Sequence, residues 1–166
     1  MIIVDRALRR LEEKGEPIRV GMVGAGAMGR AIAFQILQIT PGLRLVAIAN
    51  RTLANAEAAF AEGGAATIRV VEDEDALAAA LEQGAAAITT DPSLLCAAPG
   101  IDVVFEVTGA VEFGARVVLD AIAHKKHVVT MNAELQGTVG PILKRRAEKR
   151  IVQTALQGLR QRVEEG

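Results

Sequence analysis

Short apolar runs alternate with amphipathic stretches along most of the chain. Runs rich in β-branched residues predict strands at 18–23, 43–49, 101–107 and 127–131, with shorter extended segments at 67–71 and 85–89. Apolar residues at helical spacing predict helices between these runs, from Gly29 up to Thr40 and over 53–62, 76–82 and 111–123. Strands that alternate with helices are joined by right-handed crossovers into an open parallel sheet, so the predicted fold class is α/β.

Helices are also expected at both ends of the chain. Residues 1–14 are interpreted as an N-terminal helix, with Asp5 as a candidate N-cap. A further helix is predicted from Val139 to about Lys149. Residues 150–166 keep apolar residues at helical spacing and are expected to form a C-terminal amphipathic helix, where a further strand would be typical of such a fold. The whole chain is interpreted as a single domain.

The first strand leads directly into a glycine-rich turn, Gly24-Ala25-Gly26-Ala27-Met28-Gly29. Gly24 can adopt the backbone angles of a tight strand-to-helix turn, and Gly26 has no Cβ to obstruct a pyrophosphate. Gly29 lets the helix lie close to the strand, and the unpaired N–H groups of the first helical turn favour phosphates. With a second strand following, the pattern predicts a dinucleotide site in a Rossmann-type, doubly wound parallel sheet with extra terminal helices.

The residues after the second strand indicate which dinucleotide is preferred. An NAD site usually has an acidic residue there, which accepts hydrogen bonds from the ribose 2′-OH. This chain has Asn50-Arg51-Thr52 instead. A carboxylate would repel a 2′-phosphate, whereas Arg51 can pair with one and Thr52 can donate its hydroxyl. We therefore predict NADP as the preferred cofactor, with NAD as the alternative. Asn50 could instead cap the next helix and Arg51 could be a solvated surface charge, and both roles are compatible with cofactor binding.

Two more loops are expected at the carboxyl ends of the strands, where such sheets bind ligands. One is Thr108-Gly109-Ala110 and the other is Asn132-Ala133-Glu134. Both are predicted to flank the nicotinamide half of the cofactor, because Thr108 and Asn132 have short polar side chains that could hold a ribose or carboxamide. Glu134 could accept a hydrogen bond from a ribose hydroxyl or simply be a charge at a helix start.

Composition and charge argue against several other functions. Lys and Arg total 19 against 20 for Asp and Glu, so no strong net field favours nucleic acid or an anionic membrane. With four Phe and neither Tyr nor Trp, the chain offers no aromatic platform for stacking bases. No apolar run approaches membrane-spanning length and the first residues lack a signal-peptide pattern, so a cytoplasmic protein is expected.

No metal site is predicted and no catalytic residue can be assigned. His124 and His127 flank two lysines at a predicted helix end, where surface residues at the negative pole of the dipole are expected, and no third ligand accompanies them. The acidic run at 72–75 is expected to start the next helix. Cys96 lies in an apolar stretch and is expected to be a buried small hydrophobic residue.

Five ordered segments resemble the N-terminal cofactor domain of homoserine dehydrogenase-like proteins, over roughly residues 15–148. The closer resemblance is to the branch that carries a C-terminal SAF domain and includes the deoxyxylulose-phosphate reductoisomerase-like enzymes. The resemblance implies an NAD(P)-dependent oxidoreductase and assigns the glycine-loop role to Gly24, Gly26 and Gly29 and the adenosine-end role to Asn50, Arg51 and Thr52. The segments begin at Gly21, Leu45, Thr89, Val107 and His127.

The chain departs from that family in one loop that bears on catalysis. Homoserine dehydrogenases have an Asn-Lys pair after the last of these strands, and sugar-type relatives have Glu-Lys-Pro. Here Ala133 follows Asn132, so the resemblance assigns no catalytic lysine to this loop. The interpretation is an NADP-preferring cofactor domain of a homoserine dehydrogenase-like oxidoreductase without its substrate domain. Acting on a small-molecule substrate, it would need a proton donor that its crevice loops do not supply.

Two alternatives remain open at this point. A non-catalytic dinucleotide-sensing or interaction module would form a homo-oligomer through its terminal helices, and would bind NADPH without turnover. A domain that binds a methyl donor shares the glycine-rich loop but would normally have an acidic residue near position 50.

Overall fold

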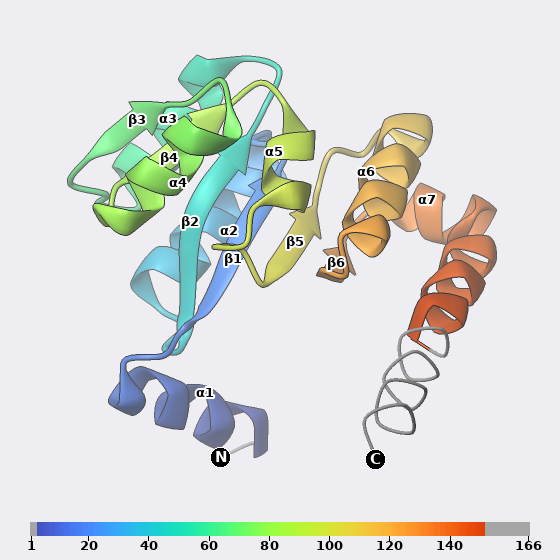
Figure 1. Cartoon of the computed structure of the whole chain (residues 1–166), viewed down its shortest axis with the longest axis horizontal. Coiled ribbons are helices and arrows are strands. Elements are labelled where there is room, and N and C mark those ends of the chain that lie inside the picture. Colours follow the sequence, from blue (N-terminus) through green and yellow to red (C-terminus); the bar gives the residue numbers. More distant parts are fainter. Residues whose placement is uncertain (1–2, 152–166) are drawn as a thin grey trace, which may run out of the picture.

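The computed structural model describes residues 3–151 and contains an open sheet between layers of helices (Figure 1). The strands are β1 (Ile18–Val23), β2 (Leu43–Ala49), β3 (Ile68–Val70), β4 (Ala86–Thr89), β5 (Val103–Glu106) and β6 (His127–Thr130). The helices are α1 (Ile3–Lys14), α2 (Ala27–Gln38), α3 (Leu53–Glu62), α4 (Glu74–Glu82), α5 (Pro92–Ala97), α6 (Val111–Ala123) and α7 (Ala133–Thr138). The α/β fold class and the Rossmann-type parallel sheet predicted from the sequence are confirmed.

The sheet order is β3-β4-β2-β1-β5-β6, with every pair of neighbouring strands parallel. The chain leaves β1 toward β2 on one side and later returns to β5 on the other. The topological switch point therefore lies between β1 and β5, and ligands of open parallel sheets bind outside the carboxyl ends of the strands at such a point. In the register, Val23 at the end of β1 is level with Ala49 of β2 and Glu106 of β5.

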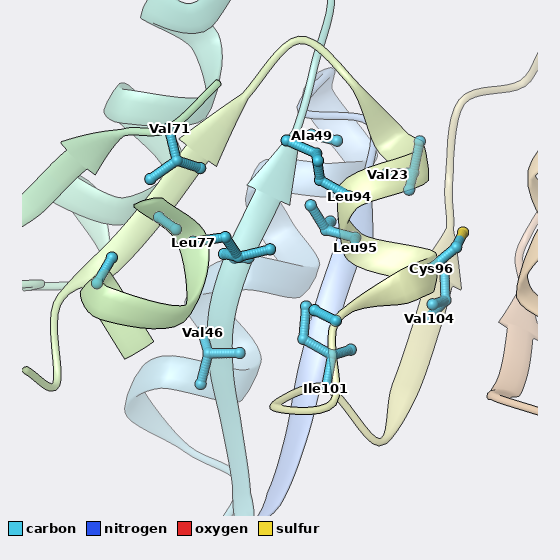
Figure 2. Packing of buried hydrophobic residues seen from close by; sticks show 14 of the residues in the cluster. Val23, Val46, Ala49, Val71, Leu77, Leu94, Leu95, Cys96, Ile101 and Val104 are labelled. Atoms are coloured by element: carbon cyan, nitrogen blue, oxygen red, sulfur yellow. The ribbon is translucent and has the colours of Figure 1, made fainter. Parts of the chain in front are cut away.

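Each face of the sheet carries its own hydrophobic core. On one face, α2 and α3 pack against β1 and β2 through residues such as Phe60, Ala33 and Ile48. On the other face, Leu77 of α4 and Leu95 of α5 pack over the same central strands (Figure 2). Burial on both faces explains why β1 and β2 read as near-continuous apolar runs in the sequence.

The structure changes several boundaries predicted from the sequence. The third and fifth strands are shorter than the predicted 67–71 and 101–107. The segment at 85–89, expected only as a short extended piece, is a full member of the sheet between β3 and β2. Because the inner strands of a sheet are held by ladders on both sides, four residues are sufficient for β4.

The helical structure after β6 begins earlier than predicted. The helix predicted from Val139 to about Lys149 is present as helical residues 140–151, and a turn residue at 139 separates it from α7, an additional helix that begins at Ala133 and was not predicted. Asn132 starts α7 as its N-cap, since its side chain accepts a hydrogen bond from the Leu135 N–H at 3.0 Å. Of the C-terminal amphipathic helix predicted for residues 150–166, the part from residue 152 onward lies outside the described residues.

The N-terminal helix is present but begins earlier than its predicted cap. Asp5 lies in the first turn of α1 rather than at the N-cap, where its charge still suits the positive end of the helix dipole. The helix lies at the amino ends of the strands (Figure 1) and contacts the connection between α2 and β2. There the Glu12 carboxylate accepts a hydrogen bond from the Gly42 N–H at 2.9 Å.

Cys96 of α5 is buried in the core, as expected from its apolar neighbours (Figure 2). Its thiol lies 3.8 Å from the Val117 carbonyl oxygen, to which it donates a weak hydrogen bond. Burial, together with the nearby Asp120 carboxylate, raises the pKa of the thiol from its ordinary 9.0 to about 12. The thiol is therefore kept protonated and unreactive in the folded chain.

This pKa shift predicts a specific pH dependence of stability. A raised folded-state pKa favours folding below the unfolded value of 9.0, and the benefit is lost as the pH rises toward about 12. Between about pH 8 and about pH 10.5, the unfolding free energy of the wild-type chain should fall by about 2 kcal/mol more than that of Cys96→Ala, which lacks the thiol. Denaturant titration of both proteins at both pH values measures this, and parallel pH profiles would contradict it.

Candidate functional site

A cavity of about 500 Å³ opens at the carboxyl ends of β1, β2, β4 and β5. Its position coincides with the topological switch point of the sheet. One wall is the turn after β1, the opposite wall is the turn after β5, and the loop after β2 closes one end. The cavity is lined by Val23, Gly24, Ala25, Gly26, Ala49, Asn50, Arg51, Thr52, Asn55, Thr90, Pro92, Val107, Thr108, Ala110 and Phe113.

The glycines of the first turn have three different structural requirements. Gly24 has a φ of 109°, a conformation open mainly to glycine, and a Cβ there would lie 3.0 Å from the Val107 carbonyl oxygen. A Cβ on Gly29 would lie 2.5 Å from the Gly24 carbonyl oxygen, so this glycine allows α2 to approach the turn. A Cβ on Gly26 would meet nothing within 4 Å and would project into open space beside the cavity wall.

The first turn of α2 completes this wall. Gly26 is its N-cap and supplies no side-chain hydrogen bond to the N–H groups that follow. These donors and the positive end of the helix dipole make an environment that suits a phosphate group. Ala27, Met28 and Gly29 belong to this turn but are not among the residues that line the cavity.

Asn50 connects the loop after β2 to the glycine-rich turn. Its side-chain oxygen accepts a hydrogen bond from the Ala25 N–H at 3.0 Å, and its amide donates to the Thr52 carbonyl oxygen at 2.8 Å. An aspartate could accept the first bond but could not donate the second. The amide is therefore matched to both loops, and it orders the end of the cavity that Arg51 and Thr52 form.

Arg51 and Thr52 are exposed at the cavity rim. Arg51 takes part in none of the ion pairs found among residues 3–151. Thr52 occupies the N-cap position of α3 without making a side-chain cap hydrogen bond. A guanidinium without a carboxylate partner, beside a hydroxyl and a helix N-terminus, forms a local environment that favours an anionic group.

The turn after β5 brings Thr108 to the cavity, as the sequence suggested. Gly109 has a φ of 71° and makes the tight turn, but it does not line the cavity. The Thr108 hydroxyl donates to the Glu106 side chain at 2.5 Å and accepts the Ala110 N–H at 3.3 Å. The hydroxyl that was expected to face a ribose or carboxamide is thus engaged within its own loop.

The loop after β6 does not form part of the cavity wall. Asn132, Ala133 and Glu134 do not line the cavity, although the sequence grouped them with it. Asn132 is 2% exposed, and its Nδ2 has no hydrogen-bond partner among the described residues. Ala133 and Glu134 are exposed in the first turn of α7. Contacts between these three residues and a nicotinamide ring stay a prediction.

Sequence reasoning missed seven cavity residues and one buried acid. Four of the seven are Asn55 in α3, Thr90 in the β4–α5 connection, Pro92 at the start of α5 and Phe113 in α6. The other three, at the ends of β1 and β2 and directly after β5, are Val23, Ala49 and Val107. If residues 85–89 had been predicted as an inner strand, the loop that contains Thr90 would have been placed at the carboxyl edge of the sheet, beside the glycine turn. Glu106 is completely buried at the end of β5, and its place in an otherwise apolar strand was the available signal.

No group of three or more His, Cys, Asp or Glu side chains within residues 3–151 could hold a metal ion. None of the described helices is both long enough and apolar enough to cross a membrane.

A glycine turn at the switch point, a helix N-terminus behind it and a polar rim after β2 together define a nicotinamide-dinucleotide-binding domain. Comparison with known families agrees and is more specific. Residues 24–150 match the model for the NAD-binding domain of homoserine dehydrogenase. The chain belongs to this family, which confirms the resemblance seen in the sequence.

Individual relatives point in the same direction. A stretch of 54 residues is 41% identical to homoserine dehydrogenase of Synechocystis sp., covering 32% of this chain and 12% of that protein. The crystal structure of a homoserine dehydrogenase from Thiobacillus denitrificans is similar over 81% of this chain, with 28% identity and a TM-score of 0.60. Myo-inositol dehydrogenase from Lactobacillus casei, in complex with NAD(H) and myo-inositol, is similar over 69%, with 27% identity and a TM-score of 0.51.

The similarity covers only part of these relatives. The matched region spans 28% of the Thiobacillus denitrificans chain and 28% of the Lactobacillus casei chain. The comparisons therefore concern the cofactor domain.

The contrast between Gly26 and Gly29 gives a test of the site. Gly26→Ala should leave the melting temperature unchanged, because the added methyl group meets no protein atom, but should weaken dinucleotide binding by about tenfold or more by obstructing the pyrophosphate. Gly29→Ala should lower the unfolding free energy by about 1–3 kcal/mol, because its methyl group collides with backbone. Calorimetric titration and thermal unfolding measure the two effects.

Gly137→Ala is a matched control for both variants. Gly137 is a helical glycine with no atom within 4 Å of an added Cβ, and it does not line the cavity. Unchanged NADPH affinity in Gly26→Ala would contradict the placement of the pyrophosphate.

Proposed function

We propose that the domain binds NADP in preference to NAD and serves a homoserine dehydrogenase-like oxidoreductase. The single observation that carries the preference is Arg51, an exposed guanidinium at the cavity rim that is unpaired among residues 3–151. Among the described residues, no acidic side chain lines the cavity to accept a ribose 2′-OH or to repel a 2′-phosphate. Thr52 and the start of α3 beside it add to an environment for a dianionic phosphate.

In this arrangement the adenosine end lies at the loop after β2, the pyrophosphate on the glycine turn and the nicotinamide toward the turn after β5. Asn50 shapes the adenosine end without occupying it, because both of its polar groups are bonded to backbone. A contact of Asn132 with the nicotinamide half is part of the proposal, and it would require the buried side chain to become accessible, because Asn132 does not line the cavity. The cofactor would supply hydride transfer to or from a small-molecule carbonyl or alcohol.

A second candidate function is dinucleotide binding without catalysis. Within residues 3–151, Arg51 is the only ionisable residue that lines the cavity, and no Lys or His lines it to donate or accept a substrate proton. This observation favours a sensing or interaction module if the chain acts without a substrate domain. Turnover assays with hydroxy acids, amino alcohols and sugar phosphates separate the two: cofactor-dependent turnover supports the enzyme, and tight NADPH binding without turnover supports the module.

The proposal includes self-association in the cytoplasm. β6 is an edge strand of the sheet. Val129 in this strand and Met131 directly after it have exposed apolar side chains. An apolar sheet edge of this kind is more commonly covered by another chain or domain than left in water. Sedimentation equilibrium tests this, and a monomer at all accessible concentrations would remove this part of the proposal.

The cofactor preference gives a quantitative prediction. Arg51→Ala should weaken NADPH binding by about tenfold, because a charge-assisted hydrogen bond to the 2′-phosphate is lost at a partly solvated site. NADH affinity should change by less than about twofold, since NADH has no such phosphate. Calorimetric titration of both cofactors against both proteins measures the difference.

Arg44→Ala is the matched control, because Arg44 is an exposed arginine near the other end of β2. It should affect neither cofactor. Tighter binding of NADH than NADPH by the wild-type chain would overturn the preference, and failure of both to bind at about millimolar concentration would overturn the dinucleotide proposal itself.

A further inference from the structure

The most unusual polar group in the described structure is the Glu106 side chain. It is completely buried at the carboxyl end of β5, and no cation pairs with it among residues 3–151. Burial of an acidic group is costly unless its oxygens are well hydrogen-bonded. Hydrogen-bond donors must therefore surround both oxygens of the Glu106 carboxyl group.

Both carboxyl oxygens of Glu106 accept hydrogen bonds, from two different loops. Oε1 accepts the Thr108 hydroxyl at 2.5 Å and the Thr108 N–H at 2.9 Å. Oε2 accepts the Thr130 hydroxyl at 2.7 Å. Glu106 thus joins the turn after β5 to the end of β6 through a single side chain.

Each threonine hydroxyl is in turn fixed by a backbone N–H. The Thr108 hydroxyl accepts from the Ala110 N–H at 3.3 Å, and the Thr130 hydroxyl accepts from the Asn132 N–H at 3.2 Å. A hydroxyl that accepts a backbone N–H has its proton free to point toward the carboxyl oxygen. The result is a continuous chain of hydrogen bonds from Ala110 to Asn132, which we call the Glu106 clamp.

The space for the clamp is provided by a close helix approach. A Cβ on Gly114 of α6 would lie 2.8 Å from the Glu106 carboxyl carbon and 2.8 Å from Leu135 Cδ1. α6 therefore covers the carboxyl closely at this glycine and excludes water from it. Thr108 and Ala110, at one end of the clamp, line the cofactor cavity, whereas Glu106 and Thr130 do not.

We infer that Glu106 is a positioning residue for the cofactor site: its side chain, held by Thr130, sets the conformation of the Thr108–Ala110 turn that forms the nicotinamide-side wall of the cavity. This inference rests on the proposed function for its effect on binding. It assigns Thr108 a role through Glu106 rather than through its own hydroxyl. The adenosine end, built by Asn50 and Arg51, is independent of the clamp.

The test uses Thr130→Val, which removes the hydroxyl at nearly constant volume from a residue outside the cofactor cavity, so any change in binding must be transmitted. NADPH affinity should fall by about tenfold in Thr130→Val and in Glu106→Gln. Affinity for 2′,5′-ADP, which fills only the adenosine end, should change by less than about twofold. A general loss of structure would weaken both ligands together.

Two further variants complete the design. Thr130→Ser retains the hydroxyl donor and should restore wild-type NADPH affinity within about twofold. Thr138→Val is the matched control, because Thr138 is an exposed threonine on α7 whose hydroxyl bonds only to helix carbonyls of its own turn. If Glu106→Gln does not fold, Thr130→Val carries the test.

Amide hydrogen exchange gives a readout that does not need a cofactor. Thr130→Val should speed exchange at the Thr108 and Ala110 amides by about tenfold, while the Ala25 amide, bonded to Asn50, should keep its wild-type rate. Unchanged exchange at Thr108 and Ala110, unchanged NADPH affinity, or equal loss of NADPH and 2′,5′-ADP would each overturn the inference. If the wild-type chain binds neither ligand, the proposed function fails, and the exchange rates alone decide on the clamp.

Discussion

The site depends on how closely three backbone segments approach one another at the carboxyl end of β1. The ladder of parallel hydrogen bonds continues past the strands, from the Gly24 N–H to the Ala49 carbonyl and from the Val107 N–H to the Val23 carbonyl, each at 2.9 Å. Only glycine fits at position 24, where the φ is positive and the Val107 carbonyl lies directly above. The glycine turn, the loop after β2 and the turn after β5 are therefore held in one fixed arrangement, and the cavity is the space between them.

Around this rigid centre, the two ends of the cavity are organised by different chemistry. At the loop after β2, the neutral amide of Asn50 connects two loops by one accepted and one donated hydrogen bond, and Arg51 is the only charged residue among the described residues that line the cavity. At the turn after β5, the buried Glu106 side chain accepts hydrogen bonds from Thr108 without lining the cavity itself. Asn50 and Glu106 thus hold the loops by hydrogen bonds, whereas Arg51 and Thr52 face the cavity. This division keeps the cavity polar without placing a carboxylate among its described lining residues.

The family assignment and the cavity residues lead to a consistent view of function. A homoserine dehydrogenase-type NAD-binding domain supplies the cofactor site, and the similarity covers about a quarter of the crystallised relative. In the proposed oxidoreductase, groups outside the described cavity would transfer the substrate proton, because no Lys or His is among the described residues that line it. Val129 of the edge strand β6, and Met131 directly after it, are exposed apolar side chains.

The sequence by itself determined the fold class, the central strands and the glycine turn, because these follow from local patterns: β1, β2, α3 and α6 have the predicted limits. It also identified the loop containing Arg51, since a fixed distance separates it from the glycines. Only the tertiary structure decided that Asn132 caps a helix without lining the cavity, and that the Thr108 hydroxyl is occupied by Glu106. Those outcomes depend on which strand ends meet and on partners such as Thr130, distant in the chain, and no local periodicity encodes them.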